Sequence, residues 1–124
     1  MSQMMQDFKN RREHKRFLVK DGVFALDSTR FGSILDISLG GLSLSSLSQH
    51  GWSLHVYDTG IILSENDIYL RDIPFRITSK TEMKNEESFS TIKIIRIGLK
   101  FGSLDNQQLT SLKNFIINKT SAEA

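Results

Sequence analysis

Apolar and polar residues alternate in several short runs along most of this chain, and the apolar spacing becomes helical only after Asp105. Glycine, serine and aspartate separate the runs, and these residues favour turns. Because successive side chains of a strand point to opposite faces, each run can bury one face and expose the other. Many short strands followed by one helix predict a mainly β fold, a small antiparallel barrel with the helix packed on its mouth or side.

Turn residues divide the expected strands. Asp21 and Gly22 interrupt the first run, RFLVKDGVFAL, and indicate either one bulged strand or a short hairpin. Pro74 has no amide hydrogen to donate, so it is expected at the start or the edge of its strand. The polar segment TEMKNEES, which begins at Thr81, is expected to be a hairpin loop before the last strand, FSTIKIIRIGLKF.

The C-terminal part of the chain has a different periodicity. Asp105 is a suitable N-cap, and the apolar residues after it repeat at helical spacing. These residues are Leu109, Leu112, Phe115 and Ile116. The pattern predicts one amphipathic helix from about residue 106 to residue 118, with its apolar face packed on the barrel.

A length of 124 residues fits one domain. Residues 1–10 are expected to be a flexible lead-in, residues 11–118 the domain, and residues 119–124 a tail. The chain has no cysteine, which excludes disulfides and thiolate metal sites and fits a cytoplasmic location. We expect no signal peptide and no membrane span, because the apolar stretches are only a few residues long.

Patterns of catalytic and metal-binding residues are lacking in the sequence. His14, His50 and His55 show neither the spacing of metal ligands nor a carboxylate partner. The chain has no G-x-S-x-G segment, and Asp36 is the only acid that belongs to a motif. Since a lone acid rarely makes an active site, we expect neither an enzyme nor a bound metal.

Positive charge is concentrated in the segment NRREHKRF, from Asn10 to Phe17. The net charge of the chain is only +2, so the local cluster says more about partners than the total charge does. Taken alone, such a cluster is either a solvated tail or a contact for an anionic partner. A second segment, DISLGG, follows an expected strand, and its two glycines let a ligand approach the main chain closely.

The two segments together resemble a known pair of motifs. Arg12 and Arg16 form an R-x-x-x-R pair, and about twenty residues later comes a D-x-S-x-x-G motif made of Asp36, Ser38 and Gly41. This combination resembles the PilZ domain, a bacterial receptor for cyclic di-GMP. The segments GLSL and RIGLKF also look like this family, so the resemblance covers nearly the whole chain.

The resemblance implies a split β-barrel of about six antiparallel strands with a C-terminal helix. It also implies a regulatory adaptor without enzymatic activity, whose ligand is cyclic di-GMP and which needs no other cofactor. Arg12 and Arg16 would meet guanine edges and phosphates, because a guanidinium can form two hydrogen bonds with guanine O6 and N7. Asp36 and Ser38 would contact the base from the barrel surface, and Gly41 would shape the turn.

Arg11 stands directly before the R-x-x-x-R pair. Family members with an arginine there tend to bind an intercalated dimer of cyclic di-GMP, so the resemblance implies two ligands for each chain. The basic segment from Asp7 to Lys15 cannot form a core of its own, and we expect it to fold over the nucleotide on binding. A downstream protein partner of unknown identity would then recognise the new shape of this arm.

Two other functions remain open from the residues. The barrel could be a protein-interaction module that no longer binds nucleotide, although the complete set of motif residues speaks against it. It could also bind single-stranded nucleic acid, as small barrels do with basic grooves and stacking aromatic residues. The basic segment offers only Phe17 for stacking, so nucleic acid is the less favoured ligand.

Overall fold

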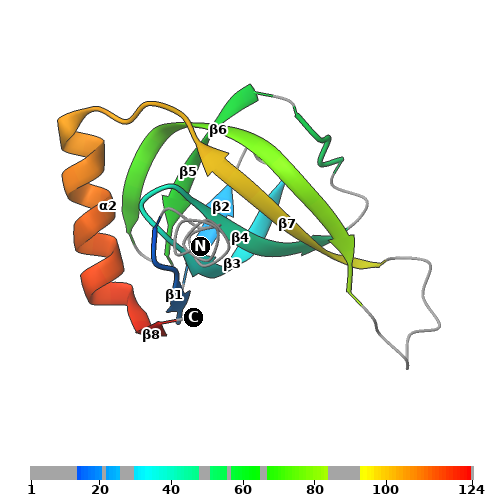
Figure 1. The fold of residues 1–124 in the computed structure, drawn as a ribbon, viewed down its shortest axis with the longest axis horizontal. Helices are drawn as coiled ribbons and strands as arrows, with labels where there is room; N and C mark the ends of the chain where they lie inside the picture. Colours follow the sequence, from blue (N-terminus) through cyan, green and yellow to red (C-terminus); the bar gives the residue numbers. More distant parts are fainter. Residues whose placement is uncertain are drawn as a thin grey trace, which may run out of the picture.

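The structure, a computed structural model, describes residues 14–20, 22–25, 30–47, 51–55, 57–64, 67–83 and 93–123. Six of the eight strands in these residues close into a barrel beside a helix (Figure 1). The barrel strands are β2 (Val23–Ala25), β3 (Phe31–Ile37), β4 (Gly41–Leu47), β5 (Tyr57–Leu63), β6 (Ile68–Glu82) and β7 (Ile94–Phe101).

The strands follow the order β2-β5-β6-β7-β4-β3 around the barrel, and pairing of β2 with β3 closes the ring. Every pairing between the described strands is antiparallel. Closure of the ring satisfies the backbone along both edges of a sheet that would otherwise be open. The mainly β fold, a small antiparallel barrel with a C-terminal helix, is therefore confirmed.

The first apolar run forms two strands along one edge of β3. β1 (Phe17–Val19) pairs with the end of β3, and β2 pairs with its beginning. Both are antiparallel to β3, so they run in the same direction and do not form a hairpin with each other. Between them, Gly22 O accepts a hydrogen bond from Ile34 N at 2.8 Å. An interrupted strand, not a hairpin, therefore describes this segment.

Apolar side chains from every strand of the ring fill the barrel. Those with no exposed surface include Phe24, Ile37, Leu44, Ile62, Ile73 and Ile97. The rings of Phe24 and Phe75 meet edge to face, with centroids 5.1 Å apart. Trp52 is also part of this core, as its type suggests, and its Nε1 donates a hydrogen bond to Ser46 Oγ, so the polar atom is satisfied.

The helix α2 (Asn106–Lys119) lies along one side of the barrel, next to β6 (Figure 1). Its N-terminus carries a capping box, in which Asp105 Oδ1 accepts from Gln108 N and Gln108 Oε1 accepts from Asp105 N. Leu112 and Phe115 are buried against the barrel. The predicted helix and its N-cap are confirmed, because both signals are local in the sequence.

The residues after the helix form a strand, not the tail that we expect from the sequence. β8 (Thr120–Glu123) pairs with β1, so the two ends of the domain lie side by side (Figure 1). Lys20 N, directly after β1, also donates to Lys119 O and connects the end of the helix to this part of the chain. A run of four residues is too short to be identified as a strand by its pattern, and the exposed edge of β1 supplies the partner.

β6 is long and holds the proline in its interior. Pro74 pairs with Thr59 of β5, although proline is expected at the start or the edge of a strand. Its carbonyl accepts from Gly102 N, so the side of Pro74 that lacks an N–H faces the end of β7. The missing N–H therefore removes no hydrogen bond between β5 and β6.

Most of the expected hairpin loop lies outside the described residues. No helix within those residues is long and apolar enough to span a membrane.

Candidate functional site

A bulge in β3 determines where Asp36 points. Ile34 and Asp36 pair with consecutive residues of β4, so Leu35 is an extra residue in this register. In a regular strand, Asp36 would share the inward face of Ile34. The extra residue turns Asp36 to the outer surface of the barrel, where its partners lie, while Ile37 returns to the core.

Asp36 is the centre of a set of polar contacts on this outer surface. Its Oδ2 accepts from Ser43 Oγ at 2.8 Å and from Arg96 Nη2 at 3.0 Å. Arg96 Nη2 also lies 3.3 Å from Ser43 Oγ, so side chains from β3, β4 and β7 hold one another in place. Arg16 Nη1 lies 4.0 Å from Asp36 Oδ1, which is an ion pair too long for a hydrogen bond. Two guanidinium groups thus face one carboxylate, which leaves an excess of positive charge.

The Oδ1 atom of Asp36 is buried and unsatisfied. Asp36 is only 4% exposed, and within the described part of the chain no donor makes a hydrogen bond to this atom. Nearly all buried polar atoms in proteins have a partner, and leaving one without a partner costs free energy. A hydrogen-bond donor on a bound molecule would satisfy this oxygen.

The register of β1 brings Arg16 to the same surface. Leu18 pairs with Asp36 across β1 and β3. Arg16 precedes Leu18 by two residues, and side chains two apart in extended chain share a face. Arg16 therefore emerges beside Asp36, and β8 holds the other edge of β1 in place.

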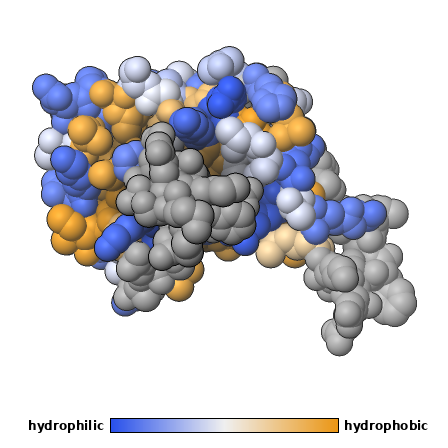
Figure 2. Space-filling view, viewed as in Figure 1, coloured by the Kyte–Doolittle hydropathy of each residue, from blue (hydrophilic) through white to orange (hydrophobic). Residues whose placement is uncertain are grey.

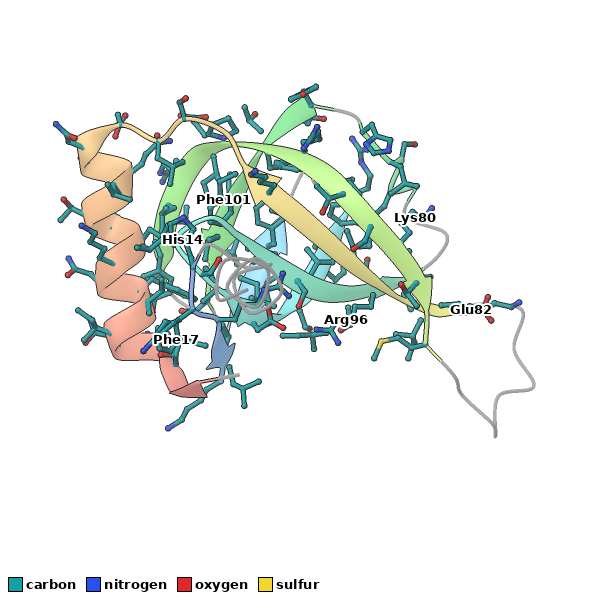
Figure 3. All side chains as sticks on the ribbon, viewed as in Figure 1. His14, Phe17, Lys80, Glu82, Arg96 and Phe101 are labelled. Atoms are coloured by element: carbon teal, nitrogen blue, oxygen red, sulfur yellow. The ribbon has the colours of Figure 1, made fainter. Side chains whose placement is uncertain are left out.

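The turn between β3 and β4 is organised by Ser38. Its Oγ accepts hydrogen bonds from Gly40 N at 3.1 Å and Gly41 N at 3.2 Å, and its main-chain N donates to Gly41 O at 2.8 Å. Gly41 has no room for a side chain, because a Cβ there would lie 2.2 Å from Leu99 O. His14 packs on the outer side of Gly40, at the start of β4 (Figure 3).

Three rows of paired residues cross the outer face of the barrel. The middle row has only small or short side chains: Asp36, Ser43, Gly98 and Ser79. The rows on either side each carry cations: Ser33, Ser45, Arg96 and Thr81 form one, and Gly41, Lys100, Arg76 and Tyr57 form the other. Gly98 leaves this row without a side chain, and a larger residue would not fit, because its Cβ would lie 2.4 Å from Ser79 Oγ. The row is therefore flat. We call Ser43, Gly98 and Ser79 the polar floor.

Two adjoining hollows open on this face, and Arg16 lines both of them. One, of about 330 Å³, lies over the polar floor beside Arg96. The other, of about 440 Å³, lies beside Gly41 and Lys100. Hollows of about 300–1,000 Å³ are the usual size for small-molecule sites. Hydrophilic residues cover β6 and β7 on the side seen in Figure 2, and Figure 3 shows Arg96 on the outer side of β7.

Three of the predicted site residues line the larger hollow: Arg16, Ser38 and Gly41. Asp36 lies next to them, 4.0 Å from Arg16, but lines neither hollow. Arg11 and Arg12 lie outside the described residues, and so does most of the basic arm. Within the described ranges, no group of three or more histidine, cysteine, aspartate or glutamate residues could hold a metal ion.

Arg96 is part of the site, although it belongs to neither sequence motif. The alternation in RIGLKF is a usable signal, because it puts Arg96, Gly98 and Lys100 on one face of a strand. The same alternation does not show which residue Arg96 contacts. Arg96 meets Asp36 across 60 positions of sequence, and that contact depends on the pairing of β3, β4 and β7.

Residues 10–118 match the PilZ domain family. The chain belongs to the PilZ family. The matched range contains both motifs and ends one residue before α2 does, so this PilZ domain accounts for the barrel and for nearly all of the helix. A search of curated proteins finds no match to the chain.

The PilZ domain described here is also similar to solved structures at low sequence identity. The PilZ domain of YcgR from Escherichia coli, solved with cyclic di-GMP, has a TM-score of 0.67 and 12% identity, over 88% of this chain and 91% of that one. MrkH, a cyclic di-GMP-dependent transcription regulatory factor, has a TM-score of 0.63 and 13% identity, over 86% of this chain and 50% of MrkH. The complex of K. pneumonia MrkH with cyclic di-GMP has a TM-score of 0.66 and 12% identity, over 86% of this chain and 51% of that one. This PilZ domain thus spans about half of MrkH, and at these identities the likeness is one of fold.

Proposed function

We propose that this PilZ domain is a receptor for cyclic di-GMP and acts as a cytoplasmic regulatory adaptor without enzymatic activity. The observation that carries the proposal is the buried Oδ1 of Asp36, which makes no hydrogen bond within the described residues. Arg16 faces this oxygen at 4.0 Å, and Arg96 binds the other oxygen of the carboxylate, at the edge of the polar floor. A guanine base has N–H donors for this oxygen and a flat ring for the floor. Phosphates suit the excess of guanidinium charge. Membership in the PilZ family and its neighbours solved with cyclic di-GMP support the same ligand.

Each residue of the site has a distinct task in this proposal. Asp36 Oδ1 accepts from guanine N1–H or N2–H. Arg16 meets a guanine edge or a phosphate, since its planar fork matches both. Arg96 holds Asp36 in place through Oδ2 and adds positive charge. Ser38 and Gly41 maintain the turn that borders the larger hollow.

The basic arm completes the site from the side opposite to the floor. The roles of Arg11 and Arg12 rest on their spacing from Arg16, because both lie outside the described residues. We propose that the arm closes over the nucleotide and that a partner protein recognises the closed form. Arg11 and Arg12 of the arm and Arg16 directly after it bring three guanidinium groups to the site. They favour a ligand with more than two phosphates, which is why we propose an intercalated dimer of cyclic di-GMP.

Closure of the arm predicts a change in amide exchange. Saturating cyclic di-GMP should slow hydrogen exchange in residues 7–15 by about tenfold or more, because amides in an ordered segment exchange only when it opens. Mass spectrometry of peptides from this segment would measure the change. Peptides from α2 serve as the internal reference, since no residue of this helix lines either hollow. Equal exchange in the arm with and without ligand would exclude closure.

Substitution of Asp36 tests its role as an acceptor. Asp36→Ala should raise the Kd for cyclic di-GMP about a hundredfold, because the buried acceptor is removed. Asp36→Asn keeps the shape but has one acceptor oxygen for the two tasks of Oδ1 and Oδ2, so its Kd should lie between the wild-type value and that of Asp36→Ala. Asp36→Ala should also lower the free energy of unfolding by about 1–2 kcal/mol, since Ser43 Oγ loses its acceptor. Calorimetric titration and urea unfolding of both variants would measure these effects, and equal binding by Asp36→Ala and the wild type would contradict the assignment.

Titration calorimetry of the wild-type chain with cyclic di-GMP decides between the proposal and its two alternatives. A receptor binds the dinucleotide and binds a single-stranded oligonucleotide of mixed sequence much more weakly. The opposite order of affinities would favour a nucleic-acid-binding barrel. Binding of neither molecule would leave a protein-interaction module as the function.

A further inference from the structure

The outer face of the barrel has a feature that neither motif includes. Tyr57, Arg76 and Lys100 lie in one row of paired residues across β5, β6 and β7, and the row continues to Gly41 of β4. Cross-strand partners project from the same face of a sheet. These three side chains therefore lie on the face that carries the polar floor.

Tyr57 and Arg76 form an exposed platform. Tyr57 is 76% exposed, and the Arg76 guanidinium carbon lies 5.9 Å from the centroid of its ring. This distance is within the range of a cation–π contact. So exposed a ring buries little apolar surface and contributes little to folding. An aromatic face beside a guanidinium plane is the arrangement on which nucleic-acid bases stack.

The platform lines a hollow of about 270 Å³. Lys100, Phe101 and Gly102 border both this hollow and the one beside Gly41, so the two are neighbours at the end of β7. Neighbouring strands lie about 4.8 Å apart, so Arg76 is about 10 Å from Gly41. A dinucleotide held at the polar floor can reach across such a distance.

The charges around this hollow favour an anion. Arg76 and Lys100 are its two cations, and Asp58 is its one acid among the described residues. The Asp58 carboxylate is turned to its own strand, where Oδ1 accepts from Thr59 N at 2.8 Å. The net charge around this hollow is therefore positive, which favours binding of a phosphate.

We propose that Tyr57, Arg76 and Lys100 form a second purine-binding position of the cyclic di-GMP site. A guanine stacks on the Tyr57 ring and the Arg76 guanidinium, and Lys100 meets a phosphate between the two hollows. This inference rests on the proposed receptor function. The stacked guanine belongs either to the far end of the same cyclic di-GMP molecule or to a second molecule, and stoichiometry distinguishes the two.

Titration calorimetry with cyclic di-GMP on the full chain tests the position. If one molecule supplies both guanines, Tyr57→Leu and Arg76→Gln should each raise the Kd about tenfold. This change lies within the range that base stacking on an aromatic side chain contributes to binding. If a second molecule supplies the guanine, each variant should lower the number of bound ligands from two to one. Tyr57→Phe keeps the ring and should bind like the wild type.

The matched control is Arg71→Gln, on the same strand as Arg76 but exposed beside α2, and it should bind like the wild type. An unchanged Kd and stoichiometry in Tyr57→Leu and Arg76→Gln would overturn the inference and leave the receptor function standing. A Tyr57→Phe variant as weak as Tyr57→Leu would overturn stacking as the mode of contact. If the wild-type chain binds no cyclic di-GMP, the receptor function fails, and this inference fails with it.

Discussion

Replacing Arg16 by alanine should raise the Kd for cyclic di-GMP by about a hundredfold and leave the domain folded. Arg16 lines both hollows, and its guanidinium lies 4.0 Å from Oδ1 of Asp36. The variant loses a bidentate hydrogen-bond contact with the ligand and a positive charge near the phosphates. Calorimetric titration would measure the loss of affinity.

The fold should tolerate this change because Arg16 contributes little to stability. Its side chain is 37% exposed, and Asp36 keeps its shorter ion pair with Arg96. Loss of such a half-exposed ion pair should lower the free energy of unfolding by less than about 1 kcal/mol. Arg16→Lys, which keeps the charge without the planar fork, should bind with intermediate affinity. An Arg16→Ala variant that binds normally, or one that unfolds, would contradict the role given to this residue.

Replacing Gly41 by alanine should destabilise the domain by about 3 kcal/mol. The new Cβ would lie 2.2 Å from Leu99 O and 3.1 Å from Lys100 Cα, and both are backbone atoms of β7. Because β4 pairs with β7 along its full length, neither strand can move away without loss of hydrogen bonds. Urea unfolding monitored by the fluorescence of Trp52, the single tryptophan, would measure the effect.

Gly40→Ala is the matched control, one residue away in the same turn. The three atoms nearest to a Cβ at Gly40 all belong to the His14 ring, the first at 2.8 Å, and this exposed side chain can rotate away. The cost should therefore be less than about 1 kcal/mol. Equal stability of the two variants would show that the turn, and not close approach of β7, explains the glycine at position 41. Gly41→Ala should also bind cyclic di-GMP more weakly, since the displaced turn borders the larger hollow.

Local features of the chain were readable without the structure. The capping box of Asp105 and Gln108 involves residues three apart, and the apolar face of α2 repeats within a few turns. The alternation in β3, β4 and β7 likewise depends on neighbours in the sequence. Such signals sufficed for a mainly β barrel with one C-terminal helix.

Features that depend on distant partners were predicted less well. The sequence predicts a tail after α2, but this segment forms β8, because the edge of β1 is free to pair with it. Pro74 lies inside β6, because β7 ends beside it and has no acceptor there that needs an amide hydrogen from position 74. In each case the partner strand, and not the residue type, decided the outcome.

The site shows the same division. The motif residues Arg16, Asp36, Ser38 and Gly41 were recognisable from their types and spacing in the chain, because each supplies a group that a nucleotide or a tight turn requires. Their meeting at one surface, the addition of Arg96 and the row from Gly41 to Tyr57 came only from the fold. A one-residue bulge at Leu35 sets the face on which Asp36 lies, and strand order sets which side chains stand beside it. The alternation within one strand indicates which face is buried, but the strand that lies beside it is determined by pairing between segments far apart in the sequence.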